Sequence, residues 1–145
     1  MLTDRTHDKN VEIFWPPLYT KWEEKVHITG LRLWGDSYLQ QIQVILSNGF
    51  VSPIFAAKAQ GKMVELDLDL DKNGPVKHIF SKAGGGLRAL SFLGYNGLKI
   101  DSWMGFDYGE WRSIELADNE FISGIYCSVS DSHYIHNFGF MISTD

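Results

Sequence analysis

The sequence has one cysteine, few basic residues and no long hydrophobic run, and each shortage excludes a class of protein. The single Cys127 cannot form a disulfide within the chain, so a small secreted scaffold held by disulfides is excluded. No apolar run approaches the roughly 18–20 residues that cross a membrane. The N-terminal residues are polar and lack the apolar centre of a signal peptide. We therefore expect a cytoplasmic protein without a membrane span.

Positive charge is scarce, because 13 Lys and Arg oppose 18 Asp and Glu, which gives a net charge of −5. Nucleic-acid binding depends on clusters of basic residues, so we expect no nucleic-acid partner. The chain has 145 residues, of which 44% are hydrophobic and 21% charged, a composition typical of one globular domain. A chain of this length can bury its own core without a metal or a disulfide. We expect a flexible tail over residues 1–10 and a single domain over residues 11–145.

The local pattern of apolar residues is that of strands. No segment carries a sustained helical period. Within residues 63–70, Val64, Leu66, Leu68 and Leu70 alternate with the acidic residues Glu65, Asp67 and Asp69. This alternation predicts a strand over 63–70 with one buried face. Fourteen glycines spread through the chain suit tight turns between short strands. The pattern as a whole predicts an all-β fold.

Three segments, 38–44, 86–92 and 134–140, align at equal spacing. Their apolar positions coincide in three sets, which are Leu39, Leu87 and Ile135; Ile42, Leu90 and Phe138; and Val44, Phe92 and Phe140. Each segment follows a short polar or glycine-rich loop, and each loop follows another β-like run, over 28–34, 76–80 and 122–129. One hairpin cannot bury its own apolar face, but three can share a core. We therefore predict a three-fold arrangement, in which the N-terminal segment completes the sheet of the last repeat.

At these residues the sequence resembles the jacalin-related lectin family. The best match is the segment 114–125, which reads Ile-Glu-Leu-Ala-Asp-Asn-Glu-Phe-Ile-Ser-Gly-Ile. Further similarity lies in the loop-and-strand segments 35–44 and 130–140 and in Trp22-Glu23-Glu24, so that the resemblance covers roughly residues 20–142. It implies a jacalin-like, three-fold β-prism of three antiparallel sheets, and a protein that binds sugar without catalysis or metal.

The resemblance also implies where sugar would bind, at the loop of the last repeat and at a second site on the loop of the first. The predicted sugar-binding residues are Ser130, Asp131, Ser132, His133, Tyr134 and His136. Those of the second site are Trp34, Gly35, Asp36, Ser37, Tyr38 and Gln40. Where the family carries an Asp after each loop, this sequence has His136, Gln40 and Arg88. Because a carboxylate accepts two strong hydroxyl hydrogen bonds, Asp131 and Asp36 are the candidates to supply it from shifted positions.

Other chemistries fit the sequence less well. The alternating aspartates over 67–71 resemble a calcium loop only in part, because His78 stands where such a loop has a glutamate. In a strand, His133 and His136 point to opposite faces, which opposes a shared metal ion. Cys127 lies in an apolar run, as a buried and unreactive thiol would. No nucleophile with a base and no pair of acids points to a catalytic site, so we expect no enzyme, no metal site and no cofactor.

Two functions remain open at this point. The first is a non-enzymatic carbohydrate-binding, lectin-like module that holds sugar at the loop ends by hydrogen bonds and aromatic stacking. Such sites bind weakly one at a time, so homo-oligomers that raise avidity are expected. The alternative is a protein-interaction or structural module that keeps the β-prism fold without sugar binding. It would use exposed tryptophan and acidic strands to contact a protein partner.

Overall fold

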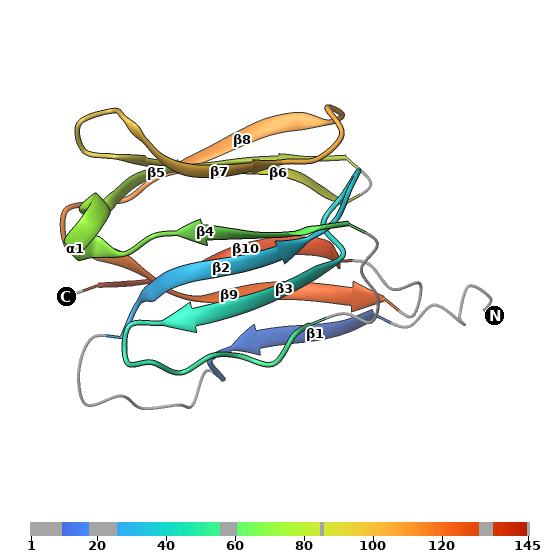
Figure 1. The fold of residues 1–145 in the computed structure, drawn as a ribbon, viewed down its shortest axis with the longest axis horizontal. Coiled ribbons are helices and arrows are strands. Elements are labelled where there is room, and N and C mark those ends of the chain that lie inside the picture. Colours follow the sequence, from blue (N-terminus) through green and yellow to red (C-terminus); the bar gives the residue numbers. More distant parts are fainter. Residues whose placement is uncertain (1–9, 18–25, 56–60, 85, 131–134, 145) are drawn as a thin grey trace.

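The computed structural model describes residues 10–17, 26–55, 61–84, 86–130 and 135–144. Over these residues the chain forms ten strands and one single-turn helix (Figure 1). The strands are β1 (Asn10–Trp15), β2 (Ile28–Trp34), β3 (Gln41–Leu46), β4 (Met63–Asp67), β5 (Val76–Ala83), β6 (Leu87–Gly94), β7 (Lys99–Met104), β8 (Glu110–Glu115), β9 (Glu120–Ser130) and β10 (Ile135–Thr144), and the helix is α1 (Leu70–Asn73). The prediction of an all-β fold is confirmed.

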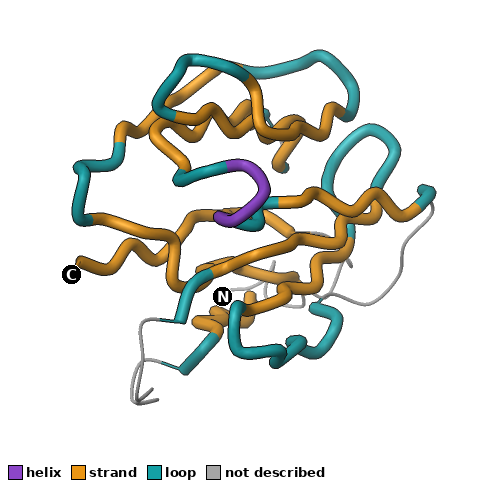
Figure 2. The backbone as a smooth tube through the Cα atoms, turned by 60° about the vertical axis from the view of Figure 1, so that its left-hand side comes forward, coloured by secondary structure: helices purple, strands orange, loops and turns teal. Residues whose placement is uncertain are grey.

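The strands form three antiparallel sheets, with the orders β1-β9-β10, β3-β2-β4 and β7-β6-β5-β8. The hairpins β2–β3, β5–β6 and β9–β10 each belong to a different sheet. Figure 2 shows the three sheets around a common interior, with α1 on the side that comes forward. The predicted β-prism of three antiparallel sheets is therefore confirmed.

The N-terminal strand completes the sheet of the last hairpin, as the sequence predicts. β1 pairs with β9 from Asn10 opposite Ser130 to Trp15 opposite Ile125. A Cβ on Gly124 would stand only 2.7 Å from Cδ of Pro16, so the close approach of the two strands requires a glycine in β9. Residues from the two ends of the chain thus lie in one sheet.

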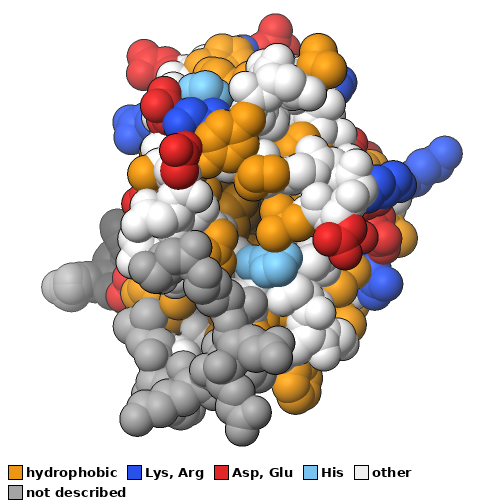
Figure 3. All heavy atoms as spheres, turned by 90° about the vertical axis from the view of Figure 1, so that its left-hand side faces the viewer, with side chains coloured by type: hydrophobic (Ala, Val, Ile, Leu, Met, Phe, Trp, Pro, Cys, Tyr) orange, Lys and Arg blue, Asp and Glu red, His pale blue; other side chains and the backbone are white. Residues whose placement is uncertain are grey.

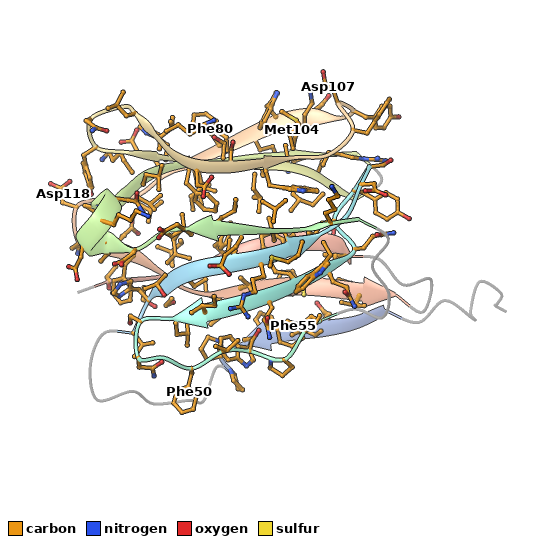
Figure 4. The ribbon with its side chains drawn as sticks, viewed as in Figure 1. Phe50, Phe55, Phe80, Met104, Asp107 and Asp118 are labelled. Carbon is orange, nitrogen blue, oxygen red and sulfur yellow. The ribbon has the colours of Figure 1, made fainter. Side chains whose placement is uncertain are left out.

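An irregular segment covers the outer edge of β3. The N–H of Ser52 donates to the carbonyl oxygen of Val44 (2.8 Å), and that of Phe55 donates to Ile42 (2.9 Å). Pro53 lies between these two contacts and has no N–H to donate, so a regular fourth strand does not form. Phe55 lies at the lower side of the molecule in Figure 4. This cover removes one free edge from the sheet.

The core is shared by the three hairpins. Leu39, Leu87 and Ile135, the first set of coinciding apolar positions, are at most 4% exposed. In the other two sets Ile42, Leu90, Val44 and Phe92 are buried, and Phe138 and Phe140 pack against the core. Side chains that the sequence places 48 residues apart therefore meet in one interior.

The predicted strand over residues 63–70 ends early. β4 stops at Asp67, and Leu70, expected on the buried face, begins α1 and is 36% exposed. Asp69 accepts a hydrogen bond from the N–H of Asp71 (3.1 Å) and so caps the helix. A short polar side chain that bonds to its own backbone favours a turn over a continued strand. The predicted strand is therefore wrong for residues 68–70, and Val64, also expected on the buried face, is 38% exposed.

Candidate functional site

The β2–β3 and β7–β8 connections and the adjoining ends of β5, β6, β9 and β10 lie at the same end of the prism, on the right in Figure 1, which we call the loop end. The predicted main sugar site falls largely outside the described residues, since Asp131, Ser132, His133 and Tyr134 and the side chains of Ser130 and His136 are not among them. In the backbone, Ser130 ends β9 opposite Asn10, and the register of β10 shifts by one residue at His136. The assignment of sugar binding to these residues stays a prediction.

The predicted second site borders an open hollow of about 490 Å³. Its lining residues are Gly35, Asp36, Lys62, Val64, Ser102, Trp103 and Met104. Asp36 is exposed, and Gly61 lies close beside it, because a Cβ on Gly61 would stand 2.7 Å from Oδ1 of Asp36. The hollow combines a carboxylate, an ammonium group and a hydroxyl with apolar surface, which is the mixture that a small polar ligand requires.

Backbone hydrogen bonds hold the β2–β3 connection in place. The N–H of Gln40 donates to the carbonyl oxygen of Trp34 (2.8 Å) and closes the loop. The N–H of Leu39 donates to Leu87 (2.8 Å), and the N–H of Phe106 donates to Ser37 (2.9 Å). Of the predicted second-site residues, Gly35 and Asp36 line the hollow, whereas the carbonyl groups of Trp34 and Ser37 are used to build the loop.

Arg88 ties three loops together at this end. Its Nε donates to the carbonyl oxygen of Gly84 (2.8 Å) and its Nη1 to that of Ser37 (3.1 Å). The guanidinium also lies over two rings, 5.4 Å from the centre of Tyr38 and 5.5 Å from that of Tyr108. One face of Tyr38 is therefore taken by a cation and is closed to sugar. In the sequence Arg88 stands out only as a position where the family has an aspartate. Its contact with Ser37 has no local signal, because the two residues are 51 positions apart.

A second hollow, of about 640 Å³, opens at the loop end between β8 and β10. Its lining residues are Ser81, Ala83, Gly84, Leu87, Tyr108, Gly109, Glu110, Arg112, Asn137 and Phe138. Within the described part of the chain, the side chains of Glu110 and Arg112 make no hydrogen bond or ion pair. Lys82, by contrast, forms an ion pair with Asp107, which is labelled in Figure 4, and lies 5.3 Å from the ring centre of Trp111. The sequence offered no signal for this hollow.

A third hollow, of about 290 Å³, lies at the opposite end and is mostly apolar. Figure 3 shows it ringed by hydrophobic side chains. The lining residues are His27, Ile28, Leu70, Pro75, Val76, Leu116, Asp118, Asn119, Glu120, Phe121 and Ile122. None of the predicted second-site residues, all of which lie within the described ranges, lines it.

Asp67 and Asp69, two of the alternating aspartates, accept backbone hydrogen bonds in the turn that leads into α1. Asp67 accepts from the N–H of Asp69 (3.0 Å) and pairs with Lys72 (2.9 Å). The Lys72 hydrogen bond, followed by that of the Asp69 N–H, lowers the pKa of Asp67 from its ordinary 3.8. In the described ranges no three His, Cys, Asp or Glu side chains gather as metal ligands would. Cys127 is buried, and desolvation raises the pKa of its thiol to about 11.

No helix among the described residues is long and apolar enough to span a membrane. No protein-family model matches the sequence, and a sequence search of curated proteins finds no match. Solved structures do match. The chain superposes on a prostate-specific WGA16 glycoprotein lectin with a TM-score of 0.70 and 17% identity, over 99% of this chain and 96% of that chain.

Two further structures broaden the comparison. Artocarpin in complex with mannotriose matches with a TM-score of 0.65 and 16% identity, over 93% of this chain and 98% of that chain. PirB matches with a TM-score of 0.66 and 14% identity, over 87% of this chain but 31% of that chain. At these identities the likeness establishes the fold, and the resemblance seen in the sequence is confirmed at that level. The chain therefore has the β-prism fold of the jacalin-related lectins.

Proposed function

We propose that the protein is a non-enzymatic carbohydrate-binding module that holds sugar at the loop end of the prism. The observation that carries this proposal is Asp36, an exposed carboxylate at the wall of a hollow of about 490 Å³. The β-prism fold, shared with structures named as lectins, supports it. A cytoplasmic location remains a prediction from the sequence.

The lining of the hollow suits a sugar ring. The carboxylate of Asp36 accepts hydrogen bonds from two vicinal hydroxyls, while Lys62 and Ser102 donate to sugar oxygens. Val64 and Met104, which are 38% and 57% exposed, offer apolar surface to the CH groups of the ring. In the same proposal Asp131, Tyr134 and His136, the residues predicted from the sequence for the main site, bind a sugar of their own.

Glycan arrays probed with the protein displayed at high valency test this function. We expect binding to a defined set of glycans and a loss of about tenfold or more in affinity for Asp36→Ala, because a charged hydrogen-bond acceptor is removed. A variant with alanine at Asp131, Tyr134 and His136 tests the predicted main site. Asp118→Ala, at the opposite end of the prism in Figure 4, is the matched control. Absence of any glycan binding, or binding unchanged in both site variants, contradicts the proposal.

A protein-interaction module is the second candidate, and one observation favours it. Four large side chains on β7, β8 and their connection are exposed, namely Met104 (57%), Phe106 (61%), Tyr108 (58%) and Trp111 (46%). Exposed aromatic residues and methionine are enriched at protein interfaces. This function predicts a stoichiometric protein partner that is lost in Trp111→Ser, together with an empty glycan array.

A further inference from the structure

Strand β8 is a free edge of its sheet, at the top of the view in Figure 1. All of its residues are exposed, three of them (Glu110, Arg112 and Glu115) are charged, and none is proline. No described residue beyond its own sheet forms a backbone hydrogen bond with residues 110–114. The N–H of Leu116 donates to Lys77 (2.8 Å), so by the alternation of an antiparallel ladder Trp111 and Ser113 direct their N–H and C=O groups to the free edge.

The side chains of β8 are self-complementary. Glu110 and Arg112 point to the same face of the strand, and neither has a partner among the described residues. The other acid of the strand, Glu115, is already bonded to His78 (3.1 Å), and this bond, with the charge of Lys77, lowers its pKa. A second β8 strand that runs antiparallel would place an Arg112 opposite each Glu110.

We propose that two copies of the chain pair through their β8 strands, about a two-fold axis that passes between the two Trp111 residues. Each Glu110 then faces Arg112 of the second copy, and the two Trp111 residues form the central hydrogen-bonded pair. Tyr108 and Ile114, which are 58% and 46% exposed, face one another at both ends of the contact. The result is a sheet that continues across the dimer.

The charges select this register over its neighbours. In an antiparallel sheet, residues that lie opposite each other point their side chains to the same face of the sheet. The two-fold axis must therefore pass through a residue of β8, and each alternative register moves the axis to another residue of the strand. An axis at residue 110 sets Glu110 against Glu110, and an axis at residue 112 sets Arg112 against Arg112. An axis at Ser113 sets Arg112 opposite Ile114 and forms no ion pair. The register centred on Trp111 forms two.

The geometry has a consequence for sugar binding that rests on the proposed function. Because the two β8 strands run antiparallel, the loop ends of the two copies point in opposite directions. Such a dimer would join two separate glycan-bearing surfaces rather than bind twice to one surface. Dimerisation itself is measured without sugar, so a failure of sugar binding leaves the test of the dimer intact.

Charge reversal gives the sharpest test, with sedimentation velocity over a concentration series as the measurement. We expect the unmodified protein to be dimeric at high concentration and monomeric on dilution. Glu110→Arg and Arg112→Glu should each weaken the dimer at least tenfold, because each sets like charges face to face. A mixture of the two single variants should associate, since every Arg then faces a Glu, and the double variant should recover dimerisation. Asp118→Arg, at the opposite end, should dimerise as the unmodified protein does.

Circular dichroism and thermal melting of each variant report whether the fold is kept, and the exposed positions 110 and 112 should tolerate the change. The proposal is overturned if the unmodified protein stays monomeric at every concentration. It is also overturned if the single variants dimerise normally, or if folded single variants do not associate when mixed.

Discussion

At the scale of single residues, Cys127 of β9 is packed in the hydrophobic core. The side chain is 0% exposed, and burial raises its pKa to about 11. At neutral pH the thiol therefore stays protonated, and the thiolate is the form that reacts. We expect iodoacetamide to leave the native protein unlabelled and to label it fully in guanidinium chloride, as measured by mass spectrometry. Rapid labelling of the folded protein would show that the thiol is accessible.

Arg88 contacts the β2–β3 and β7–β8 connections and the end of β5. Its guanidinium donates to two loops and stacks near two rings, a set of contacts that the flexible ammonium of lysine does not reproduce. We expect Arg88→Lys to lower the free energy of unfolding by about 1–3 kcal/mol. Amide hydrogen exchange should become faster over residues 35–40 and 105–109. Lys99→Ala, an exposed change on β7, is the control, and equal exchange in both variants would contradict this role.

At the scale of elements, the turn from β4 into α1 depends on the ionised form of Asp67. Lys72 and the N–H of Asp69 hold the pKa of Asp67 below 3.8 in the folded protein. A carboxyl group whose pKa is lowered by folding stabilises the folded state. This contribution is complete at pH values above the ordinary pKa of the group and is lost as the pH falls through its pKa in the folded protein. Both side chains are largely exposed to solvent, so water screens the ion pair and its contribution to stability is small.

The measurement is urea denaturation from about pH 6 to pH 2. Asp67→Asn should be less stable than the unmodified protein at pH 6, and the difference should disappear in acid. Asp118→Asn, an exposed acid without an ion pair in the described ranges, should show no such pH-dependent difference. A gap between Asp67→Asn and the unmodified protein that persists at pH 2 would assign the effect to something other than ionisation.

At the scale of the whole molecule, all three sheets share one hydrophobic core. A core substitution in any one hairpin should therefore destabilise the entire domain. Leu39, Leu87 and Ile135 occupy coinciding positions and are at most 4% exposed. Replacing any one of them by alanine should lower the free energy of unfolding by about 2–5 kcal/mol. Unfolding should remain a single transition, because the core is common.

Denaturant unfolding followed by tryptophan fluorescence and by circular dichroism measures both quantities. Leu98→Ala is the matched control, since Leu98 is 67% exposed and its removal leaves no cavity. If one of the three core variants were as stable as the control, the corresponding hairpin would not share the core. Separate transitions for the two probes would show that the sheets unfold independently.

The parts of this protein that could be predicted are those recorded in local patterns. Alternation of apolar residues marks strands, and β2 spans the predicted 28–34 to the residue. The turn at Asp69 was missed because an apolar alternation continues through it, while the side-chain hydrogen bonds that end the strand depend on geometry. The role of Arg88 was missed for a different reason, since one of its acceptors, Ser37, is 51 residues away.

The sequence by itself determined the class of fold, because strand periodicity and three equally spaced hairpins can bury their apolar faces only by sharing a core. The tertiary structure decided which groups at the loops are available. It closed one face of Tyr38 with a cation, left Asp36 at an open hollow and set β8 at a free edge, with Glu110 and Arg112 unpaired among the described residues. These outcomes depend on contacts between residues far apart in the chain and on the order of strands in a sheet, which no local pattern encodes.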